Sequence, residues 1–231
     1  MGKQSFFVTG TDTDVGKSAV TAGFLALAAA AGLRTLAIKP VASGCDETPD
    51  GLRNTDALHL QAAMTETLSY EQVNPVALKP AIAPHVAAAE AGVTLSAGRL
   101  AGFCRGTMMR PGDLFLVEGA GGWRVPLNDR ETYADLPRSL EMPVILVVGL
   151  KLGCINHALL SAEAIRRDGL TLAGWVANQC VAEPMARQEQ TLSYLRGHML
   201  APCLGHVPWI ESAGSFPAPD AVAAHLALPA R

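Results

Sequence analysis

Short apolar runs alternate with longer segments rich in alanine and leucine along most of the chain. Consecutive apolar and β-branched residues are typical of strands that are buried on both faces, as in a parallel sheet. FLVEG and PVILVVG are the clearest of these runs. The runs that predict strands lie at residues 6–9, 35–39, 114–118, 144–148, 172–178 and 204–207.

The longer segments predict helices, because alanine and leucine favour the helical backbone. We expect these helices at residues 17–31, 55–64, 84–91, 95–105, 132–140, 155–167 and 184–196, with a short last helix after a loop near Ser215. Strands that alternate with helices form parallel βαβ units, so the pattern predicts an α/β fold with a mostly parallel central sheet and helices on both faces. No linker or internal repeat interrupts it, and we predict a single domain over residues 1–231.

Composition narrows the class of protein. Of the 231 residues, 49% are hydrophobic and only 5% are aromatic, so the core should be aliphatic. The formal net charge is −3 without a basic block, which argues against a nucleic-acid partner. The five dispersed cysteines favour reduced thiols, and no signal peptide precedes the first strand. The longest apolar run, at residues 143–150, is too short to cross a bilayer, so we expect a cytoplasmic protein without a membrane partner.

A glycine-containing loop, GTDTDVGKS at residues 10–18, follows the first predicted strand and opens a helix. This context is typical of phosphate-binding loops, in which backbone N–H groups and the helix N-terminus face an anion. Lys17 would then reach the outer phosphates, and the Ser18 hydroxyl would bind Mg²⁺. However, five residues separate Gly10 from Gly16, one more than in the common pattern. The alternative is an ordinary turn between a strand and a helix.

Polar residues follow other predicted strands, at the sheet edge where ligands of open parallel sheets bind. Lys39 would stabilise a phosphoryl group or an anion there, unless it is a solvated lysine at a strand end. Ser43 would donate its hydroxyl to a substrate. Asp56 and Glu118, together with Ser18, would give Mg²⁺ the hard oxygen ligands that it prefers. A carboxylate that merely favours a helix N-terminus is the alternative for Asp56.

Two later segments carry further candidates. Asn178 ends a predicted strand, where an amide can pair with the edge of adenine or simply occupy a turn. Pro208 and Trp209 follow the last predicted strand. Residues 153–156 precede a helix, and their backbone N–H groups would bind a carboxylate, unless Asn156 is an ordinary N-cap. The six histidines show no metal-ligand spacing.

Seven segments, taken together, resemble the dethiobiotin synthetase family: VTGTDTDVGKS, IKPVASG, GLRNTDAL, LVEGAGGW, PVILVVGLKLGCINHALL, LTLAGWVAN and GHVPWI. They run in order from about residue 6 to residue 210, and the family's own loop has the longer glycine spacing. The resemblance implies a P-loop NTPase-like fold and a ligase that uses ATP and Mg²⁺. In that reaction 7,8-diaminononanoate and CO₂ give a carbamate, which attacks the γ-phosphate of ATP. The second amine then closes the ring to dethiobiotin, with release of ADP and phosphate.

The resemblance also implies roles for single positions. The catalytic lysines would be Lys39 and Lys17, and the metal ligands Ser18, Asp56 and Glu118. The ATP-binding positions would be Asp14, Val15, Gly16, Lys17, Ser18, Ala19, Asp56, Glu118, Gly119, Ala120, Gly121, Asn178, Gln179, Val207, Pro208, Trp209 and Glu211. The substrate positions would be Thr13, Ser43, Gly153, Cys154 and Asn156. A homodimer is implied, with the diamino acid at the interface and its carboxylate on residues 153–156 of the partner.

The sequence departs from the familiar pattern at a few positions. Asp14 and Ser18 stand where glutamate and threonine are familiar, and serine keeps the metal-binding hydroxyl. Arg124 and Val125 differ as well, which affects substrate contacts rather than the reaction. The part of the chain after Glu211 carries no segment of the resemblance.

Three other classes of protein are compatible with a phosphate loop. Partitioning and septum-site ATPases carry an extra lysine early in the loop, where this chain has Thr11, Asp12 and Thr13. The amidotransferase of cobalamin synthesis adds a glutaminase domain, for which 231 residues leave no room. A nucleotide-binding scaffold without catalysis would have no need of Lys39 and its KPVASG segment.

Overall fold

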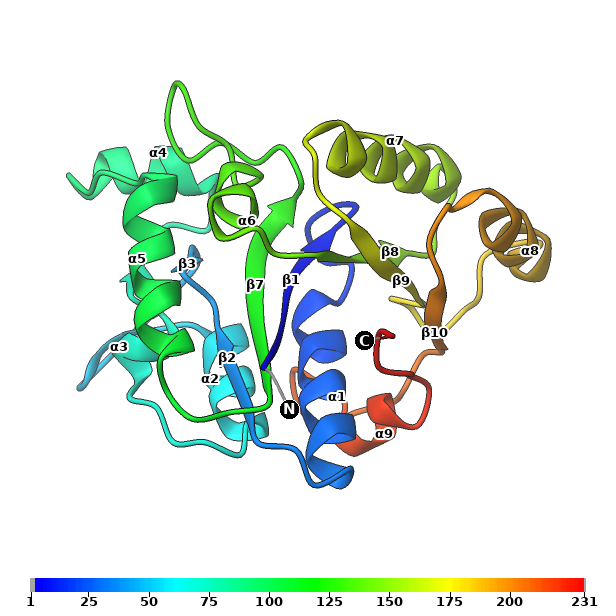
Figure 1. Ribbon diagram of the computed structural model, residues 1–231, viewed down its shortest axis with the longest axis horizontal. Coiled ribbons are helices and arrows are strands. Elements are labelled where there is room, and N and C mark those ends of the chain that lie inside the picture. The colour runs from blue at the N-terminus through cyan, green and yellow to red at the C-terminus, as the bar shows by residue number, and fades with distance from the viewer. Residues whose placement is uncertain (1–2, 231) are drawn as a thin grey trace.

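Six parallel strands form the central sheet of the computed structural model, which describes residues 3–230 (Figure 1). Residues 1, 2 and 231 of the predicted domain lie outside the described residues. The strand order is β10–β9–β8–β1–β7–β2, and every neighbouring pair is parallel. The bounds are β1 Gln4–Gly10, β2 Thr35–Ile38, β7 Leu114–Gly122, β8 Val144–Gly149, β9 Leu172–Asn178 and β10 Cys203–Val207. The predicted α/β class and mostly parallel sheet are confirmed.

Helices cover both faces of this sheet. Figure 1 shows α1, α2 and α9 on one side, and α5, α6, α7 and α8 on the other. The bounds are α1 Lys17–Ala30, α2 Thr55–Ala63, α3 Tyr70–Val73, α4 Pro84–Glu90, α5 Ala97–Met108, α6 Asp135–Leu140, α7 Cys154–Arg167, α8 Gln188–His198 and α9 Pro219–Ala223. Among the described residues, none of these helices is both long and apolar enough to cross a membrane.

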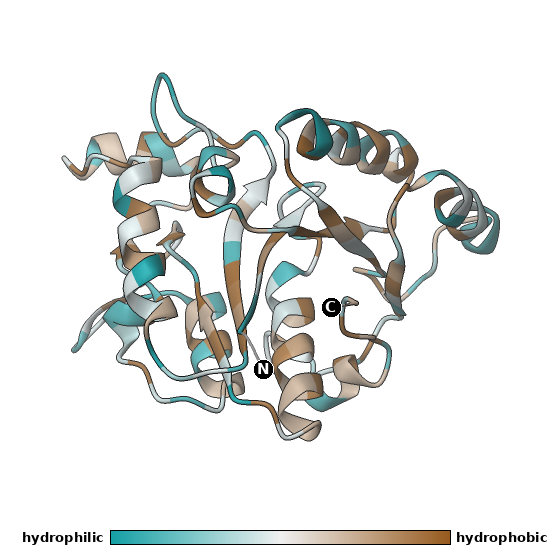
Figure 2. Ribbon diagram, in the orientation of Figure 1, coloured by the Kyte–Doolittle hydropathy of each residue, from teal (hydrophilic) through white to brown (hydrophobic). Residues whose placement is uncertain are grey.

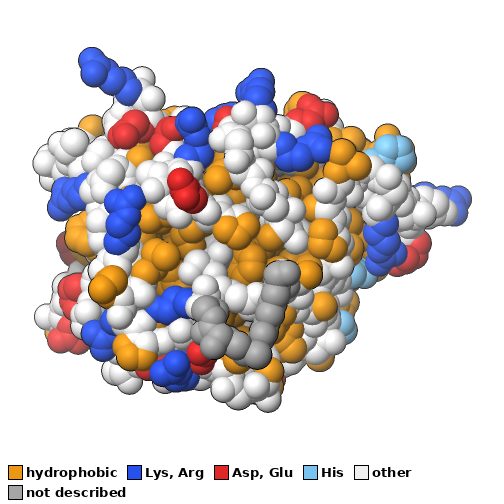
Figure 3. Space-filling model, in the orientation of Figure 1, with side chains coloured by type: hydrophobic (Ala, Val, Ile, Leu, Met, Phe, Trp, Pro, Cys, Tyr) orange, Lys and Arg blue, Asp and Glu red, His pale blue; other side chains and the backbone are white. Residues whose placement is uncertain are grey.

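The core lies between the sheet and the two helical layers. All six residues of β8 are buried, and the hydrophobic strands stand out at the centre of the molecule in Figure 2. Aliphatic side chains dominate the core, as predicted, although Trp175, Tyr133 and Phe7 are its largest fully buried side chains. On the face shown in Figure 3, charged side chains of both signs are interspersed around an apolar centre.

Some boundaries differ from the prediction. The helix expected at residues 184–196 begins only at Gln188, because Gln179 donates to the carbonyls of Val181 and Ala182 and because Arg187 has a positive φ of 57°. The helix expected at residues 132–140 begins at Asp135, whose carboxylate accepts from the Thr132 amide.

Several short elements were not predicted. They are α3 and the strands β3 Val41–Ala42, β4 Asp46–Thr48, β5 Gly51–Arg53 and β6 Val76–Ala77. The β4–β5 pair is an exposed hairpin without an apolar alternation, so no hydrophobic pattern marks it.

The C-terminal tail returns to the sheet. Val222 of α9 packs against α1 at Gly23, where a Cβ atom would lie only 2.6 Å from Val222 Cγ1. Beyond α9, Leu226 forms an antiparallel bridge with Gly205 of β10, and the Ala227 amide donates to the Leu204 carbonyl at 2.7 Å. The tail therefore covers the outer edge of β10.

Candidate functional site

The loop between β1 and α1 makes a tight bend. β1 ends at Gly10 and α1 begins at Lys17. Asp14 and Gly16 have positive φ angles of 56° and 83°, a conformation that glycine adopts without steric penalty. The bend takes up the extra residue of the loop while the strand and helix keep the positions that the phosphate-loop interpretation requires.

Asn178, at the end of β9, braces this loop. Its Nδ2 atom donates to the Val15 carbonyl at 3.0 Å. A Cβ atom on Gly16 would lie 2.2 Å from the same Nδ2, so a larger residue there would displace the amide. The turn interpretation of Asn178 is therefore insufficient, since the side chain holds a loop that is distant in sequence.

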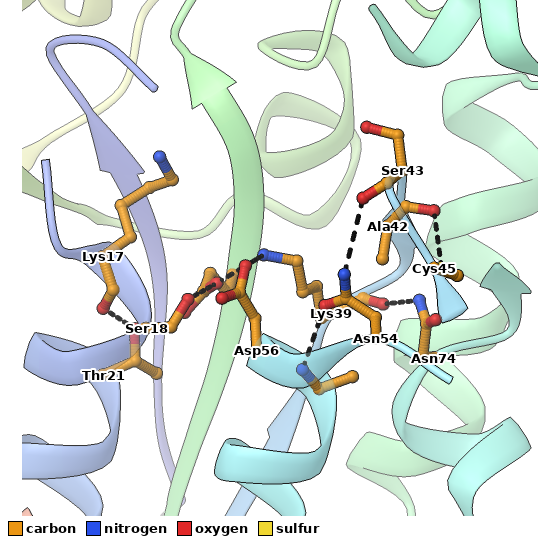
Figure 4. A network of polar contacts seen from close by, with 12 residues as sticks. Lys17, Ser18, Thr21, Lys39, Ala42, Ser43, Cys45, Asn54, Asp56 and Asn74 are labelled. Atoms are coloured by element: carbon orange, nitrogen blue, oxygen red, sulfur yellow. Dashed lines mark hydrogen bonds and ion pairs between the residues drawn. The ribbon is translucent and has the colours of Figure 1, made fainter. Parts of the chain in front are cut away.

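A buried cluster of charges lies beside the loop, as Figure 4 shows. Lys39 Nζ donates to Glu118 Oε1 at 2.8 Å and to Asp56 Oδ2 at 2.5 Å. Ser18 Oγ donates to the same Glu118 oxygen at 2.7 Å. Lys39 is only 4% exposed and Glu118 is fully buried, so the alternative of a solvated lysine at a strand end is wrong.

The neighbouring elements fix the cluster in place. The Lys39 amide donates to the Val73 carbonyl at 2.8 Å, and Asn74 Nδ2 donates to the Lys39 carbonyl at 2.8 Å. Asn54 caps α2 by accepting from the Ala57 amide, which places Asp56 in the first turn of the helix. Asp56 thus favours the helix N-terminus and also pairs with Lys39, while its role as a metal ligand stays a prediction.

The surroundings shift the pKa values of the two buried lysines in opposite directions. Burial alone would lower the pKa of Lys39, but the carboxylates of Glu118 and Asp56 outweigh it and raise this pKa. Burial, reinforced by the nearby Lys39 charge, lowers the pKa of Lys17. Burial would raise the pKa of Asp56, yet the Lys39 ammonium lowers it overall. The nearby carboxylates of Glu118, Asp56 and Asp14 offset the lowering of the Lys17 pKa only in part, so an anionic ligand would favour the charged form of Lys17 further.

The cluster suits a hard divalent cation. Glu118 Oε2 is buried and has no hydrogen-bond partner among the described residues. Such an orphaned carboxylate oxygen is costly unless a ligand or water satisfies it. Within the described part of the chain no group of three or more histidine, cysteine or acidic side chains could hold a metal alone. The predicted set of one hydroxyl and two carboxylates fits Mg²⁺, which keeps several waters and bridges phosphates.

A cavity of about 990 Å³ opens above the loop and the cluster. Its wall contains most of the residues that the sequence predicted for ATP and substrate. They are Thr13, Asp14, Gly16, Lys17, Ser18, Ala19, Lys39, Ser43, Asp56, Ala120, Gly121, Asn178, Gln179, Val207, Pro208 and Trp209. The predicted positions thus converge on one site at the carboxyl edge of the sheet.

Other predicted positions lie outside this wall. Val15 is buried beneath the loop and Glu118 lies in the cluster below the cavity. Gly119 packs against Phe7, where a Cβ atom would meet the ring at 2.9 Å. Glu211 is exposed beside the cavity and does not line it.

Gly153, Cys154 and Asn156 also lie apart from the cavity, at the start of α7. Gly153 is the N-cap, with a φ of 95°, so the interpretation of Asn156 as an ordinary N-cap is wrong. Cys154 is buried and Gly153 is exposed.

Part of the wall consists of residues that were not among the predicted site positions. These are residues 42, 44, 81–84, 125–126, 180, 210, 212 and 214–217. Residues after Glu211 carried no recognised pattern, although a segment rich in serine, glycine and proline that follows a strand at this edge is a general signal for a ligand-binding loop.

Comparison with known sequences identifies the relatives of this chain. A family model described as "AAA domain" matches residues 4–215. The ATP-dependent dethiobiotin synthetase BioD of Marinobacter nauticus is 62% identical over 226 residues, covering 98% of this chain and 97% of that protein. The enzymes of the same name from Cellvibrio japonicus and Pseudomonas aeruginosa are 58% identical over 228 residues and 60% identical over 225 residues. These two cover 99% and 97% of this chain, and 97% and 96% of the respective relatives.

Solved structures share the fold at much lower identity. A ParA family ATPase from Chlorobium tepidum has a TM-score of 0.56 at 14% identity, covering 91% of this chain and 86% of that one. The septum site-determining protein MinD from Pyrococcus horikoshii, complexed with Mg-ADP, has a TM-score of 0.54 at 16% identity, covering 89% and 82%. These likenesses confirm the P-loop NTPase-like fold alone, whereas identity along nearly the whole sequence shows that the chain belongs to the dethiobiotin synthetase family.

Proposed function

We propose that this chain performs the ATP-dependent dethiobiotin synthetase reaction in the cavity described above. One observation carries the proposal: the phosphate-type loop, Lys39 and Asp56 line a single cavity, and Lys39 also bonds to Glu118 below it. The wall also holds the predicted base-side positions Asn178, Gln179 and 207–209, together with the substrate positions Thr13 and Ser43. High identity to enzymes of that name supports the same activity.

The reaction would proceed in three steps. One amine of 7,8-diaminononanoate adds to CO₂ and loses a proton, which gives a carbamate. A carbamate oxygen attacks the γ-phosphorus of ATP, so that ADP leaves and a carbamic–phosphoric anhydride forms. The second amine attacks the carbamate carbon and expels phosphate, closing the ureido ring of dethiobiotin. The protein contributes mainly position and charge stabilisation to such phosphoryl transfer.

The loop would hold the phosphates of ATP. Lys17 is buried without a carboxylate hydrogen bond, and its Nζ contacts the Asp12 carbonyl at 3.2 Å. An anion at the N-terminus of α1 would satisfy this charge and the backbone N–H groups together. At the base end, Asn178 Nδ2 donates to the Val15 carbonyl of the loop, and Oδ1 would accept a hydrogen bond from the amino group of adenine. Residues 207–209 would form the rest of the base pocket, with Gln179 beside them.

Mg²⁺ would bind at Ser18, Asp56 and Glu118, where the orphaned Glu118 Oε2 lies. When bound, it would neutralise phosphate charge. Lys39 remains protonated beside these carboxylates and borders the cavity, so its ammonium group is available to the transferred phosphoryl group. The hydroxyls of Thr13 and Ser43 would contact the carbamate and the substrate amines.

A second copy of the chain would complete the binding site for the diamino acid. Residues 153–156 lie away from the cavity of their own protomer, yet Leu152 just before α7 is 93% exposed and Leu160 within α7 is 56% exposed. Large exposed apolar side chains can mark an interface. In a homodimer, the backbone N–H groups at the start of the partner's α7 would bind the carboxylate of the substrate. Light scattering that gives the mass of a monomer would contradict this part of the proposal.

We also propose a cytoplasmic location and a single functional domain for the chain. The five free cysteines suit a reducing compartment. One hydrophobic core cluster joins residues from Phe6 to Val222, which suits one domain.

The direct test supplies purified protein with ATP, Mg²⁺, bicarbonate and 7,8-diaminononanoate. Dethiobiotin, ADP and phosphate should form in equal amounts, as measured by mass spectrometry and phosphate release. Omission of the diamino acid should abolish ATP turnover. ATP hydrolysis that continues at the same rate without the diamino acid would rule out the proposed function.

A further inference from the structure

The segment between β10 and α9 contributes a side of the cavity that belongs to none of the recognised motifs. Residues 212–217, which we call the strap, supply Ser212, Gly214, Ser215, Phe216 and Pro217 to the wall. Figure 1 shows the segment in orange to red between β10 and α9. The strap begins next to the base-side residues 207–210 and ends beside α2, the helix that carries Asp56.

The strap lies between two anchored segments and is also bonded within itself. Before it, the Gln179 amide donates to the Val207 carbonyl at 2.9 Å. After its end, α9 packs on α1 through Val222. Between them, Ser212 Oγ donates to the Phe216 carbonyl at 2.5 Å and accepts from the Gly214 amide at 3.1 Å. The strap is therefore an ordered part of the wall.

An aromatic stack joins the strap to α2. The rings of Phe216 and His59 lie parallel, with centroids 4.2 Å apart and an interplanar angle of 14°. His59 follows Asp56 by three residues, so both side chains lie on the same side of α2. His59 Nε2 is buried and has no hydrogen-bond partner within residues 3–230. The imidazole thus has no polar contact at Nε2 that explains its position, and the stack is its specific interaction with the strap.

We propose that Phe216 and His59 are positioning residues of the nucleotide site, which hold the strap against α2 and so complete the wall along the bound ATP. The same wall includes Asn178 and Trp209 at the base end and Ser18 and Asp56 at the phosphate end. The inference rests on the proposed function, because it takes the cavity to be the ATP site. Neither residue would touch the reacting atoms, so the stack should affect ATP binding and leave the chemical step unchanged.

The main test replaces Phe216 by alanine and measures steady-state kinetics. We expect the KM for ATP, and the Kd for a non-hydrolysable ATP analogue, to rise about tenfold, in line with an aromatic contact and its buried area. We expect kcat and the KM for the diamino acid to stay within about twofold of the unmodified chain. His59→Ala should give the same pattern, and the double variant should be little worse than either single one, because both changes remove one interaction.

Conservative variants distinguish positioning from mere stability. Phe216→Tyr and His59→Phe keep a stacked pair of rings, so both should retain nearly the original KM for ATP. The matched control is Tyr194→Ala, which removes a second stack, between Tyr194 and His198 on α8, with centroids 3.8 Å apart and outside the cavity wall. That control should leave the KM for ATP unchanged, whatever its effect on the melting temperature.

Two outcomes would overturn the inference. One is an unchanged KM for ATP in Phe216→Ala, even with a lowered melting temperature, since the stack would then serve stability alone. The other is a failure of His59→Phe to restore the affinity lost in His59→Ala. Should Phe216→Ala not fold, Phe216→Leu provides the same comparison. Asn178→Ala distinguishes the proposed ATP site from the role of the stack. If it leaves ATP binding intact, the proposed ATP site is wrong. If it weakens ATP binding while the Phe216 and His59 variants do not, only the role of the stack is contradicted.

Discussion

The floor of the cavity and the phosphate-type loop each contain a buried lysine, but only the lysine of the floor forms ion pairs with carboxylates. On the floor, Lys39 is bonded to Glu118 and Asp56, so its charge is compensated before any ligand arrives. At the loop, Lys17 donates to the Asp12 carbonyl and has no hydrogen bond to a carboxylate within residues 3–230, and burial lowers its pKa. The charge of Lys39 is therefore held in place before ATP binds. Burial of the Lys17 charge is instead unfavourable for the free protein, and a bound anion would reduce this free-energy cost. Four experiments test this contrast.

The largest effect is expected for Lys39→Met. Loss of the ammonium group that stabilises the transferred phosphoryl should reduce kcat about a thousandfold. The two carboxylates left without a partner should also lower the free energy of unfolding by about 3 kcal/mol, with the fold retained. Turnover and urea denaturation measure the two effects. Lys79→Met is the matched control, because Lys79 forms an exposed pair with Glu47. Unchanged turnover in Lys39→Met would remove Lys39 from the mechanism.

Lys17→Met should have the opposite effect on stability. ATP affinity should fall on the order of a hundredfold, because a buried contact between opposite charges is lost. Without ATP, however, the free energy of unfolding should rise by about 1 kcal/mol, because an uncompensated buried charge is gone. Calorimetric titration and urea denaturation without nucleotide report the two quantities. A destabilised Lys17→Met variant would show that the loop is preorganised like the floor, and the contrast would disappear.

Gly16→Ala tests how the loop is braced. The added Cβ would collide with Asn178 Nδ2 and would stand at a positive φ, so ATP affinity should fall about tenfold as the loop shifts. Gly32→Ala is the matched control, because Gly32 has a φ of 77° but no heavy atom within 4 Å of the added Cβ. Both variants place alanine at a positive φ, so Gly32→Ala shows what that strain does to the fold, whereas Gly16→Ala adds strain and a collision within the ATP loop. Equal ATP affinity in the two variants would contradict the bracing role of Asn178.

The smallest expected effect is the uptake of protons when ATP binds beside Lys17. The pKa of Lys17 is lowered from 10.5 by burial, so part of the Lys17 population loses its proton as pH rises toward 10.5. ATP would raise this pKa again, and its binding should take up protons in that alkaline range while the affinity falls with rising pH. Calorimetry in buffers of different ionisation enthalpy measures the uptake. A Lys17→Met variant with the same alkaline uptake would assign the proton to another group.

The same linkage gives opposite signs for protein stability. The raised pKa of Lys39 contributes stability that is fully present below 10.5 and is lost as pH rises through the folded value. For Lys17 the unfolded chain binds the proton more tightly, so its contribution to stability increases as pH rises toward 10.5. The contrast between floor and loop is thus also a contrast in pH dependence.

The residues that could be predicted from the sequence lie in or just after the buried runs of strands. Lys39 follows β2, Asn178 ends β9 and Glu118 follows the buried run LFLV within β7, and the parallel topology brings these positions to one edge. The pairing of Lys39 with Asp56 could not be predicted, because it depends on how α2 returns to the sheet. The strap was missed for a similar reason. Phe216 reaches His59 only because α9 packs on α1, and a lone phenylalanine in a polar loop carries no periodic signal.

The return of the tail to β10 bears on how the protein can be shortened or tagged. An edge strand with open N–H and C=O groups is a template for pairing with another molecule, and here Leu226 and Ala227 occupy part of that edge. A chain cut before residue 226 would expose the edge, and we expect it to self-associate in solution. An affinity tag is therefore better attached at the N-terminus, where it leaves this cover of β10 in place.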